Sequence, residues 1–453
     1  MEMQPLRQFY DSGATRSFAF RTEQLKKLRD LVTANETAIT HALYTDLHKS
    51  REEAYATEIG LFMAEINHAI KNLRKWMAPK RVKTTLANLP STSRVYRDPL
   101  GVVLIAGPWN YPFQLVIVPL MAAMAAGNCA VIKPSEHAPA TAAVLEQIIT
   151  KNFPADYITV VTGDGEKILP ALMDSFRFDH LFFTGSIAVG KILYQLAARQ
   201  LIPVTLELGG KSPVVVEPDA AMPVAANRIV LGKFINAGQT CIAPDYILVH
   251  QSVKDQLVSS LIRSIENFYT TDPLTSHDFG RIINTVRFDK LLAMMQEGRI
   301  IYGGQHNRDE LFIAPTLVEL AGTDVSLMQE EIFGPVLPVI TYNDKEEALN
   351  IINLNPNPLA FYVFTASNSS AAQWIRDLAF GGGCINNTAY HFTNLHLPFG
   401  GVGNSGIGLY HGRYSFDAFS RPKPVMKTPV WFDPRIRYPS FKGKINLLKK
   451  IFR

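Results

Sequence analysis

Cysteine is scarce in this chain. Only Cys129, Cys241 and Cys384 occur among 453 residues, and no two of them have C-x-x-C spacing. An odd count without paired spacing argues against a disulfide framework or a zinc site, and it favours a reducing, cytoplasmic environment. The N-terminus also lacks a basic region followed by an apolar run, so no secretory signal peptide is predicted.

Charge is missing altogether between Asp98 and Lys133. A membrane-spanning helix needs roughly 20 consecutive apolar residues. Here Pro108, Pro112 and Pro119 interrupt the run. Because proline removes a backbone donor and kinks a helix, the stretch favours a buried strand, a loop and a buried helix over a membrane span. The helix is predicted over 113–126 and is closed by Gly127.

Acidic residues are absent from the last 20 positions, 434–453, where seven basic residues occur. Subtracting those seven charges from the net charge of +5 leaves −2 for the rest of the chain. The basicity therefore belongs to a tail and does not indicate a nucleic-acid-binding surface.

From residue 101 onward, short apolar segments alternate with helical ones. Strands are predicted near 101–107, 129–133, 157–163 and 180–185, and the alternation restarts after Glu207 with segments near 213–217, 246–250, 336–342 and 359–365. Buried strands separated by helices are typical of parallel sheets with crossover connections. The sequence therefore predicts an α/β fold with two doubly wound domains, joined near residues 206–210.

Two amphipathic segments, about 21–48 and 52–77, precede this alternation and predict a pair of N-terminal helices. The polar stretch 83–99 follows them without a clear helical pattern. It predicts either a linker or an exposed hairpin.

Cys241 closes the segment NAGQTC, residues 236–241, just after a predicted helix. Glycine and small polar residues beside a thiol favour an accessible turn, where a thiolate could attack a carbonyl. The alternative is a buried structural cysteine, which is the commoner role of an isolated thiol. Cys129 fits that alternative because it lies in an apolar strand, and Cys384 is intermediate. Spacing alone does not single out Cys241.

Two carboxylates are candidate site residues. Glu207 lies between apolar residues at a predicted strand end, where burial would raise its pKa and suit a general base. The alternative is an ion pair with a lysine or arginine. Glu331 and Phe333, in QEEIFGP, combine an acid with an aromatic ring that together could hold a sugar and a flat ring. Their alternative is an ordinary helix cap and turn.

Two loops follow predicted strands at the end where open α/β sheets bind ligands. Asn110 stands in PWNYP after the first strand, and its amide could stabilise an oxyanion. The segment FTGS, residues 183–186, opens a helix that contains Gly190, and such a helix N-terminus accommodates a phosphate. The spacing is not G-x-G-x-x-G, so this phosphate signal is weak when taken alone.

Taken together, seven motifs resemble those of the aldehyde dehydrogenase superfamily, both in their residues and in their order along the chain. They run from residue 108 to residue 406 and read PWNYP, KPSE, FTGS…G, LELGGKSP, GQTC, EEIFGP and PFGGVGNSG. The short N-terminal region and the ending 403–422 look most like the class 3 branch, which includes fatty-aldehyde, aromatic-aldehyde and bacterial coniferyl-aldehyde enzymes.

The resemblance implies a catalytic set. Cys241 would be the nucleophile, Glu207 would activate the hydrolytic water, and Asn110 with the backbone N–H of Cys241 would form the oxyanion hole. The reaction would then pass through a thiohemiacetal and a thioester on Cys241.

The resemblance also implies NAD or NADP as cofactor. Glu136 indicates NAD, because a carboxylate at the ribose accepts hydrogen bonds from free hydroxyls and repels a 2′-phosphate, but class 3 relatives often use both. The implied cofactor-contacting residues are Ile105, Pro108, Trp109, Lys133, Glu136, Gly185, Ser186, Gly190, Leu208, Glu331 and Phe333.

The implied architecture has four parts: a cofactor-binding domain (1–82 and 101–206), a catalytic domain (207–385), a small β arm for oligomerisation (83–100 and 386–421) and a basic amphipathic tail (422–453). By analogy with the class 3 branch, we expect a homodimer.

The expected substrate pocket is apolar and suits aliphatic or aromatic aldehydes. The alternative is that several of these side chains are core residues. The predicted lining is Tyr111, Leu115, Phe234, Ile235 and Ile242.

The tail mixes lysines with large apolar residues, so that Ile445, Leu448, Ile451 and Phe452 could share one helix face. Such a helix could lie at an anionic membrane surface, although it is far too short to span one. Alternatively, the tail is a solvated terminus or a helix over the partner subunit's substrate entrance.

Three other functions remain open at this point. A CoA-acylating dehydrogenase is disfavoured by Glu207, since hydrolysis is the step that needs a base for water. A cysteine hydrolase would act on esters without a cofactor. A non-catalytic membrane-associated or structural protein is disfavoured, because it would not need the catalytic set Asn110, Glu207, Cys241 and Glu331.

Overall fold

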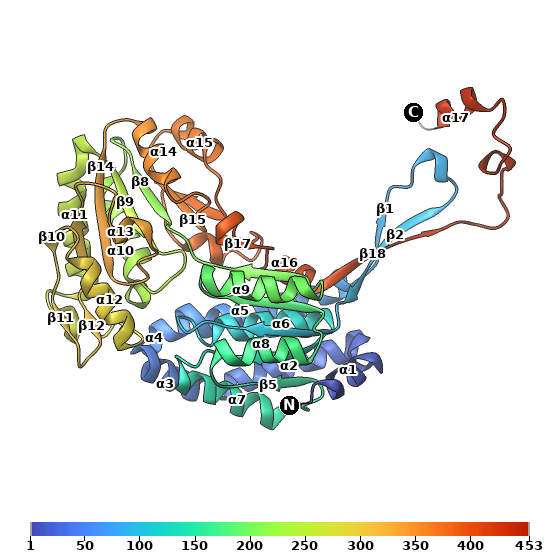
Figure 1. Ribbon diagram of the computed structural model, residues 1–453, viewed down its shortest axis with the longest axis horizontal. Helices are drawn as coiled ribbons and strands as arrows, with labels where there is room; N and C mark the ends of the chain where they lie inside the picture. Colours follow the sequence, from blue (N-terminus) through green and yellow to red (C-terminus); the bar gives the residue numbers. More distant parts are fainter. Residues whose placement is uncertain (1, 452–453) are drawn as a thin grey trace.

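The computed structural model describes residues 2–451; Phe452, assigned above to the apolar face of the tail, lies outside them. Two lobes, each built on a β-sheet, meet at an angle, and a slender arm projects away from both (Figure 1). The predicted α/β class with parallel sheets is confirmed.

The first lobe contains a six-stranded sheet. Its strands pair in parallel except for β17, which pairs with β7 in the antiparallel sense. The strands β3, β4 and β6 are buried along their whole length, as the continuous apolar runs of a covered parallel sheet require. In spatial order the strands are β17 (Gly406–Ile407), β7 (Val204–Glu207), β6 (His180–Thr184), β3 (Val102–Ala106), β4 (Cys129–Lys133) and β5 (Ile158–Val160).

The second lobe contains a seven-stranded sheet, parallel except where β10 pairs with β13. Its central strands β8, β9 and β15 are almost entirely buried. In spatial order the strands are β10 (Arg299–Tyr302), β13 (Thr316–Glu319), β14 (Val336–Tyr342), β9 (Tyr246–His250), β8 (Pro213–Val216), β15 (Ala360–Phe364) and β16 (Gly382–Ile385).

The N-terminal helical region differs from the predicted pair. The first segment, 21–48, is divided between α2 (Phe18–Ala34) and α3 (Glu36–Leu47), because Asn35 leaves helical geometry and its side-chain amide donates to Leu31 O at 2.8 Å. The second segment is continuous from residue 51 to residue 77. It consists of α4 (Arg51–Ala54), the π-helical turn η2 (Tyr55–Ile59) and α5 (Gly60–Met77).

The chain that links the strands forms helices on both lobes. The first lobe's α6 is closed by Gly127, as the sequence predicts. The remaining elements are α1 (Gln4–Asp11), η1 (Ala14–Arg16), α6 (Gln114–Ala126), α7 (Pro139–Asn152), α8 (Gly165–Ser175), α9 (Ile187–Arg199), α10 (Met222–Phe234), η4 (Ile235–Gly238), η5 (Gln251–Val253), α11 (Lys254–Tyr269), η6 (Pro273–Thr275), α12 (Thr285–Met295), β11 (His306–Asn307), β12 (Phe312–Ile313), α13 (Ser326–Gln329), α14 (Lys345–Asn353), α15 (Asn368–Asp377), η7 (Tyr390–Thr393), η8 (Gly403–Ser405), α16 (Arg413–Ala418), η9 (Arg435–Arg437) and α17 (Ile445–Ile451).

The arm is a three-stranded antiparallel sheet of β1 (Lys80–Val82), β2 (Thr92–Pro99) and β18 (Ser420–Lys427). The polar stretch 83–99 is thus mostly the turn and second strand of a hairpin, one of its two predicted alternatives. Along its whole length β18 pairs with β2, so it crosses the expected boundary between arm and tail at residue 421. Of the expected arm segment 386–421, only Ser420 and Arg421 enter this sheet; β17 and α16 lie against the first lobe instead.

None of the helices within residues 2–451 is long and apolar enough to cross a membrane. The uncharged stretch 99–132 forms β3, the following loop, the buried helix α6 and the start of β4.

Candidate active site

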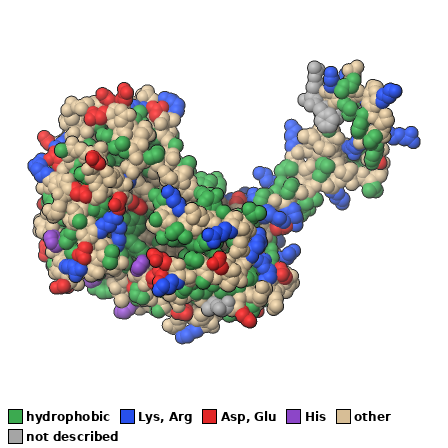
Figure 2. Space-filling view, in the orientation of Figure 1, with side chains coloured by type: hydrophobic (Ala, Val, Ile, Leu, Met, Phe, Trp, Pro, Cys, Tyr) green, Lys and Arg blue, Asp and Glu red, His purple; other side chains and the backbone are tan. Residues whose placement is uncertain are grey.

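A cavity of about 760 Å³ lies where the two lobes meet. Figure 2 shows this face of the molecule hollowed between the lobes, with hydrophobic side chains gathered in the hollow. The first lobe contributes the loops that follow β3, β6 and β7, three neighbouring strands whose carboxyl ends share one edge of the sheet. The second lobe contributes the segments around residues 235–242 and 329–333. This is the position at which open α/β sheets bind ligands.

Cys241 lines the cavity from a turn that follows η4 and is partly exposed. Burial, together with the nearby carboxyls of Glu331 and Glu207, raises the pKa of the thiol to about 12. The thiol is therefore the resting form, and a base must take its proton before or during attack. Cys129 is buried in β4, in agreement with a structural role.

Asn110 lies in the loop after β3, and its side chain is turned toward the Cys241 loop. Its amide Nδ2 donates to Gln239 O at 2.9 Å, which ties the two loops together. A primary amide has two N–H donors, so this bond leaves one hydrogen for another acceptor. The backbone oxygen of Asn110 accepts from Asn236 Nδ2 at 2.8 Å and from Lys49 Nζ at 3.0 Å.

Glu207 lies at the end of β7 and also lines the cavity. The ion pair considered as its alternative is absent: neither carboxylate oxygen has a hydrogen-bond partner among the residues described. Burial raises the pKa of this carboxyl well above its ordinary value. An unpaired, desolvated carboxyl beside a thiol has the properties of a general base.

Glu331 and Phe333 line the cavity on the second lobe. Burial, and then the neighbouring Asp245, raise the pKa of Glu331 to about 8. The ring of Phe333 meets that of Trp109 edge to face, with centroids 5.2 Å apart. Arg287 Nη2 donates to Ile332 O at 2.7 Å and so holds the backbone between them.

The N-terminus of α9 opens onto the cavity through Gly185 and Ser186. The Ser186 hydroxyl accepts from Val189 N at 3.3 Å, which caps the helix. Gly190 lies one turn further on and does not line the cavity. A Cβ there would come within 2.6 Å of Leu208 Cδ2, so glycine is needed for α9 to approach Leu208, which does line the cavity.

Lys133 and Glu136 lie apart from the cavity lining and form an ion pair with each other. Glu136 also accepts from Gly165 N at 2.8 Å. Burial alone would raise the pKa of Glu136, but the hydrogen bonds from Lys133 and from the Gly165 N–H outweigh it and lower the pKa below its ordinary value. The carboxylate is therefore ionised at neutral pH.

Two further predicted contacts, besides Gly190, Lys133 and Glu136, do not line the cavity. Ile105 is fully buried within β3 and is a core residue. Phe234 is also buried, and its ring packs against Tyr269 with centroids 6.4 Å apart, because the end of α10 directs it toward α11. Tyr111, Leu115, Ile235 and Ile242 do line the cavity, as do Pro108 and Trp109.

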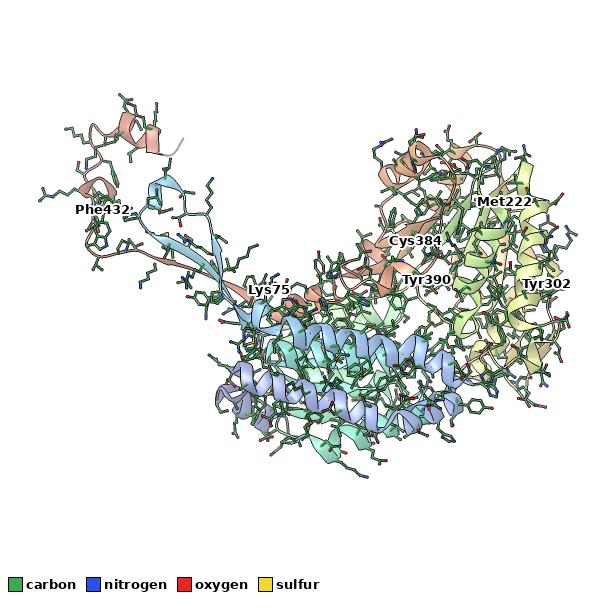
Figure 3. The ribbon with its side chains drawn as sticks, turned by 180° about the vertical axis from the view of Figure 1, so that it is seen from behind. Lys75, Met222, Tyr302, Cys384, Tyr390 and Phe432 are labelled. Carbon is green, nitrogen blue, oxygen red and sulfur yellow. The ribbon has the colours of Figure 1, made fainter. Side chains whose placement is uncertain are left out.

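The sequence reasoning missed one wall of the cavity, which comes from the last part of the chain. Figure 3 shows Tyr390 near Cys384, on the side of the second lobe that faces the first. The sequence does contain a signal for this wall, because aromatic residues are concentrated around the glycine-rich motif PFGGVGNSG. These aromatic residues were assigned no role from the sequence. The missed lining residues of this wall are Tyr390, Phe392, Phe399, Tyr410 and His411; Leu231 of α10 also lines the cavity and was not predicted.

In the part of the chain that the structure describes, no cluster of three or more His, Cys, Asp or Glu side chains could hold a metal ion.

The comparisons with known proteins identify the family. The model of the aldehyde dehydrogenase family matches residues 7–425. The chain belongs to the aldehyde dehydrogenase family. The 4,4′-diaponeurosporen-aldehyde dehydrogenase of Staphylococcus aureus is 46% identical to it, over 98% of each chain. Aldehyde dehydrogenase family 3 member H1 of Arabidopsis thaliana is 41% identical, over 98% of this chain and 93% of the relative.

The fold agrees as well. The substrate-bound structure of Staphylococcus aureus AldH matches with a TM-score of 0.97 and 45% identity, over 99% of this chain and 98% of that chain. The enzyme is thus an aldehyde dehydrogenase with class 3 relatives, and members of its family use NAD or NADP. The family, the enzyme class and the cofactor predicted from sequence are confirmed.

Proposed function

We propose that this aldehyde dehydrogenase oxidises apolar aldehydes, medium- or long-chain aliphatic or aromatic, to carboxylic acids through a covalent intermediate on Cys241. The observation that carries the proposal is that one cavity brings Cys241, Asn110 and Glu207 together under a mainly apolar, aromatic wall. A nucleophile, an oxyanion donor and an unpaired carboxyl within one site are the groups that acyl transfer to water needs.

The first step is attack of Cys241 Sγ on the aldehyde carbon. The thiol proton passes to solvent water as the S–C bond forms, and the electron pair of the C=O π bond moves to the carbonyl oxygen. The negative charge that develops on the carbonyl oxygen is stabilised by the free amide hydrogen of Asn110 and the backbone N–H of Cys241. A nicotinamide dinucleotide, which Glu331, Phe333 and the N-terminus of α9 would hold, would supply the oxidant: it would take up the hydride that the thiohemiacetal carbon loses when the thioester forms.

The second step is hydrolysis of the thioester. Glu207 accepts a proton from water as the water attacks the acyl carbon, and Cys241 leaves as the thiolate. Because burial raises its pKa, the Glu207 carboxylate is a stronger base than an exposed glutamate. Transfer of the acyl group to CoA would need no such base, which disfavours the acylating alternative.

The residues present fit a nicotinamide dinucleotide. Thr184 Oγ1 is a buried hydroxyl with no partner among the described residues, and it lies at the cavity wall next to the N-terminus of α9. Gly185 and Ser186 would hold the pyrophosphate at that terminus, with Leu208 and Gly190 supporting it. Glu331 and Phe333 would hold the nicotinamide half.

Lys133 and Glu136 would hold the adenosine ribose. The ionised Glu136 carboxylate favours the free hydroxyls of NAD, whereas the ammonium of Lys133 beside it reduces repulsion of the NADP phosphate. We therefore expect NAD to be preferred and NADP to be used as well.

The apolar substrate class follows from the walls of the pocket. Tyr111 is the polar side chain closest in sequence to Asn110, and its hydroxyl is already bonded to Thr240 Oγ1 at 2.5 Å. Leu115, Ile235, Ile242 and the aromatic residues of the missed wall offer no charge to a carboxylated substrate.

The decisive experiment follows absorbance at 340 nm with NAD or NADP and aldehydes from acetaldehyde to hexadecanal, with benzaldehyde and 4,4′-diaponeurosporen-aldehyde included. We expect kcat/KM to rise with chain length and Cys241→Ala to abolish reduction. Reduction only when CoA is added would refute the hydrolytic assignment, and ester hydrolysis without any cofactor dependence would favour a cysteine hydrolase.

The arm and the tail support two proposals about assembly. The arm sheet projects away from the lobes and leaves the outer edge of β18 unpaired within residues 2–451, as a strand that docks on a second copy would do. We propose a homodimer on this basis. Beyond β18, Trp431 and Phe432 are exposed among basic residues, and we propose peripheral contact of this tail with an anionic membrane.

A further inference from the structure

Two carboxylates of the N-terminal helical region reach the two loops that carry the reaction. Glu53 lies in α4, one residue before its end, and Glu58 lies five residues later, in the π-helical turn η2. In that turn Gly60 N donates to Tyr55 O, an i+5 hydrogen bond. A π-turn inside a helix is rare and is frequently found at functional sites.

Glu58 holds the Asn110 loop from within the core. Its Oε1 pairs with Lys49 Nζ at 2.6 Å, and both side chains have no exposed surface. Its Oε2 accepts from Phe113 N at 2.9 Å and from Gln114 N at 3.1 Å, at the start of α6. Lys49 then donates to Asn110 O at 3.0 Å. The ion pair thus binds the backbone within PWNYP and directly after it.

Glu53 holds the Cys241 loop. Its Oε1 accepts from Asn236 N at 2.7 Å. Asn236 and Ala237 have φ values of 53° and 50°, a left-handed conformation that residues other than glycine keep only where their surroundings enforce it. The Asn236 side chain returns to the first loop through its bond to Asn110 O.

A buried ion pair is a weak source of stability, because the cost of removing two charges from water can exceed their attraction. Such a pair is better explained by the geometry that it imposes. Here every remaining bond of Lys49 and Glu58 is made to the loop of Asn110 or to the start of the helix that follows it.

We propose that Lys49, Glu53 and Glu58 are positioning residues that set Asn110 and Cys241 at the correct separation for the oxyanion hole. Glu58 and Lys49 place Asn110, and Glu53 places the turn that contains Cys241. This inference rests on the proposed roles of Asn110 and Cys241.

A double-mutant cycle tests whether Lys49 and Glu58 place Asn110. The variant Lys49→Met/Glu58→Gln removes both charges together, so neither is left buried alone. We expect its kcat to fall about 10- to 100-fold, since a displacement of about 1 Å in a reacting group costs about that much, with the KM for NAD unchanged. In the Asn110→Ala background the same two changes lower kcat less than about threefold, because the group they position is gone.

An equal fall in both backgrounds, or an unchanged kcat in the folded double variant, would overturn the assignment. If the double variant does not fold, the single variant Glu58→Gln takes its place in the same cycle. The matched control is Lys254→Met/Glu319→Gln, which removes the ion pair between α11 and β13, away from the cavity lining; the exposed Arg299, which also pairs with Glu319, remains solvated. We expect it to keep the wild-type kcat.

Alkylation of Cys241 by iodoacetamide tests whether Glu53 places the turn that contains Cys241. This reaction does not depend on the oxyanion hole. Glu53→Gln, which weakens the bond to Asn236 N, is expected to change the alkylation rate more than threefold, whereas Lys49→Met/Glu58→Gln leaves it unchanged. Equal rates for Glu53→Gln and the wild type would overturn the role of Glu53. A wild-type kcat for Asn110→Ala alone would instead refute the proposed oxyanion assignment, and the alkylation rates would still decide the role of Glu53.

Discussion

The side chain of Glu207 is unusual among the buried carboxylates of this enzyme. Glu58 has Lys49 and two backbone N–H donors, and Glu65 has the Gly412 N–H, whereas Glu207 has no partner among the described residues. A group that is buried without compensation lowers stability. Its retention at the cavity wall is explained if it acts during the reaction.

Glu207→Gln separates the two chemical steps. Gln cannot accept the proton of water, so the thioester should form but hydrolyse slowly. We expect one equivalent of reduced cofactor per site in a rapid burst, followed by a steady rate lower by about 10²- to 10⁴-fold. Stopped-flow absorbance at 340 nm measures both phases.

Cys241→Ala is the control for that burst, because it should remove both phases. Loss of the burst in Glu207→Gln as well would assign Glu207 to deprotonation of the thiol rather than to activation of water.

Glu65 predicts a pH-dependent change in stability. Burial, opposed only by the Gly412 N–H, raises its pKa to about 7. The unfolded chain loses this proton near pH 4.5, so between pH 4.5 and pH 7 the folded state binds more protons and its stability falls as the pH rises. The loss is about 1.4 kcal/mol for each pH unit, so above pH 7 the free energy of unfolding is lower by about 3 kcal/mol than at pH 4.5.

Glu65→Gln keeps an acceptor for Gly412 N but does not titrate. Its free energy of unfolding, relative to wild type, should therefore increase by about 3 kcal/mol from pH 4.5 to pH 8, as urea unfolding at the two pH values would show. A difference that does not vary with pH would mean that Glu65 is ionised in the folded protein at pH 4.5.

Among the elements, helix α6 is stabilised by the contacts at its C-terminal end. Gly127 terminates it in the left-handed region, with a φ of +90°, and the Arg21 guanidinium lies where a Cβ of residue 127 would stand. Arg21 donates to Thr15 O at 2.9 Å and to Ala125 O at 3.3 Å, which satisfies a carbonyl in the last turn.

Gly127→Ala should therefore lower the free energy of unfolding by about 2 kcal/mol or more, since the strain of the left-handed conformation adds to displacement of Arg21. Chemical unfolding measures the loss. Gly322→Ala is the matched control, because its Cβ would meet no atom within 4 Å and its φ lies outside the left-handed range; it should change stability little.

Elements with a strong local pattern could be predicted from the sequence. The buried strands β3, β4 and β6 are short apolar runs bounded by glycine or polar residues, and α6 ends at the glycine that predicted its end. The positions of Asn110 and Glu207 follow from the same pattern, because residues at strand ends gather at one edge. Cys241 instead follows α10 and η4 on the second lobe, so its place beside them does not follow from the strand pattern.

What could not be predicted depends on tertiary contacts. Asn35 divides a continuous helical periodicity through one side-chain bond, and Phe234 turns to the core although its neighbour Ile235 lines the cavity. Tyr390 and Phe399 line the cavity although they are far in sequence from Asn110 and Cys241, and no local spacing pattern predicts such a contact.

At the scale of the whole molecule, the chain leaves its second lobe, completes the sheet of the first lobe with β17, and only then forms the arm strand β18. Both lobes and the arm are therefore connected by the segment 386–427, which also supplies one wall of the cavity. Assembly through the arm would thus act on the same segment that lines the cavity.

The position of β18 determines how the tail should be removed. A stop after Arg421 would delete six of the eight β18 residues and would disturb the arm as well. A stop after Lys427 leaves the whole strand and removes the exposed apolar and basic residues from 428 onward. We expect this truncated enzyme to keep its kcat with short aldehydes and its elution volume in gel filtration.

The truncated enzyme should nevertheless lose co-sedimentation with vesicles that contain anionic lipid. Each lysine or arginine near such a surface contributes about 1 kcal/mol, so binding of the full chain should weaken with added salt, whereas insertion of Trp431 and Phe432 resists salt. Trp431→Ser/Phe432→Ser isolates the apolar part, and vesicles of neutral lipid isolate the charge. If the full chain and the truncated chain sediment equally with anionic vesicles, the tail does not contact membranes, and its exposed aromatic residues must instead be covered by a second copy of the enzyme.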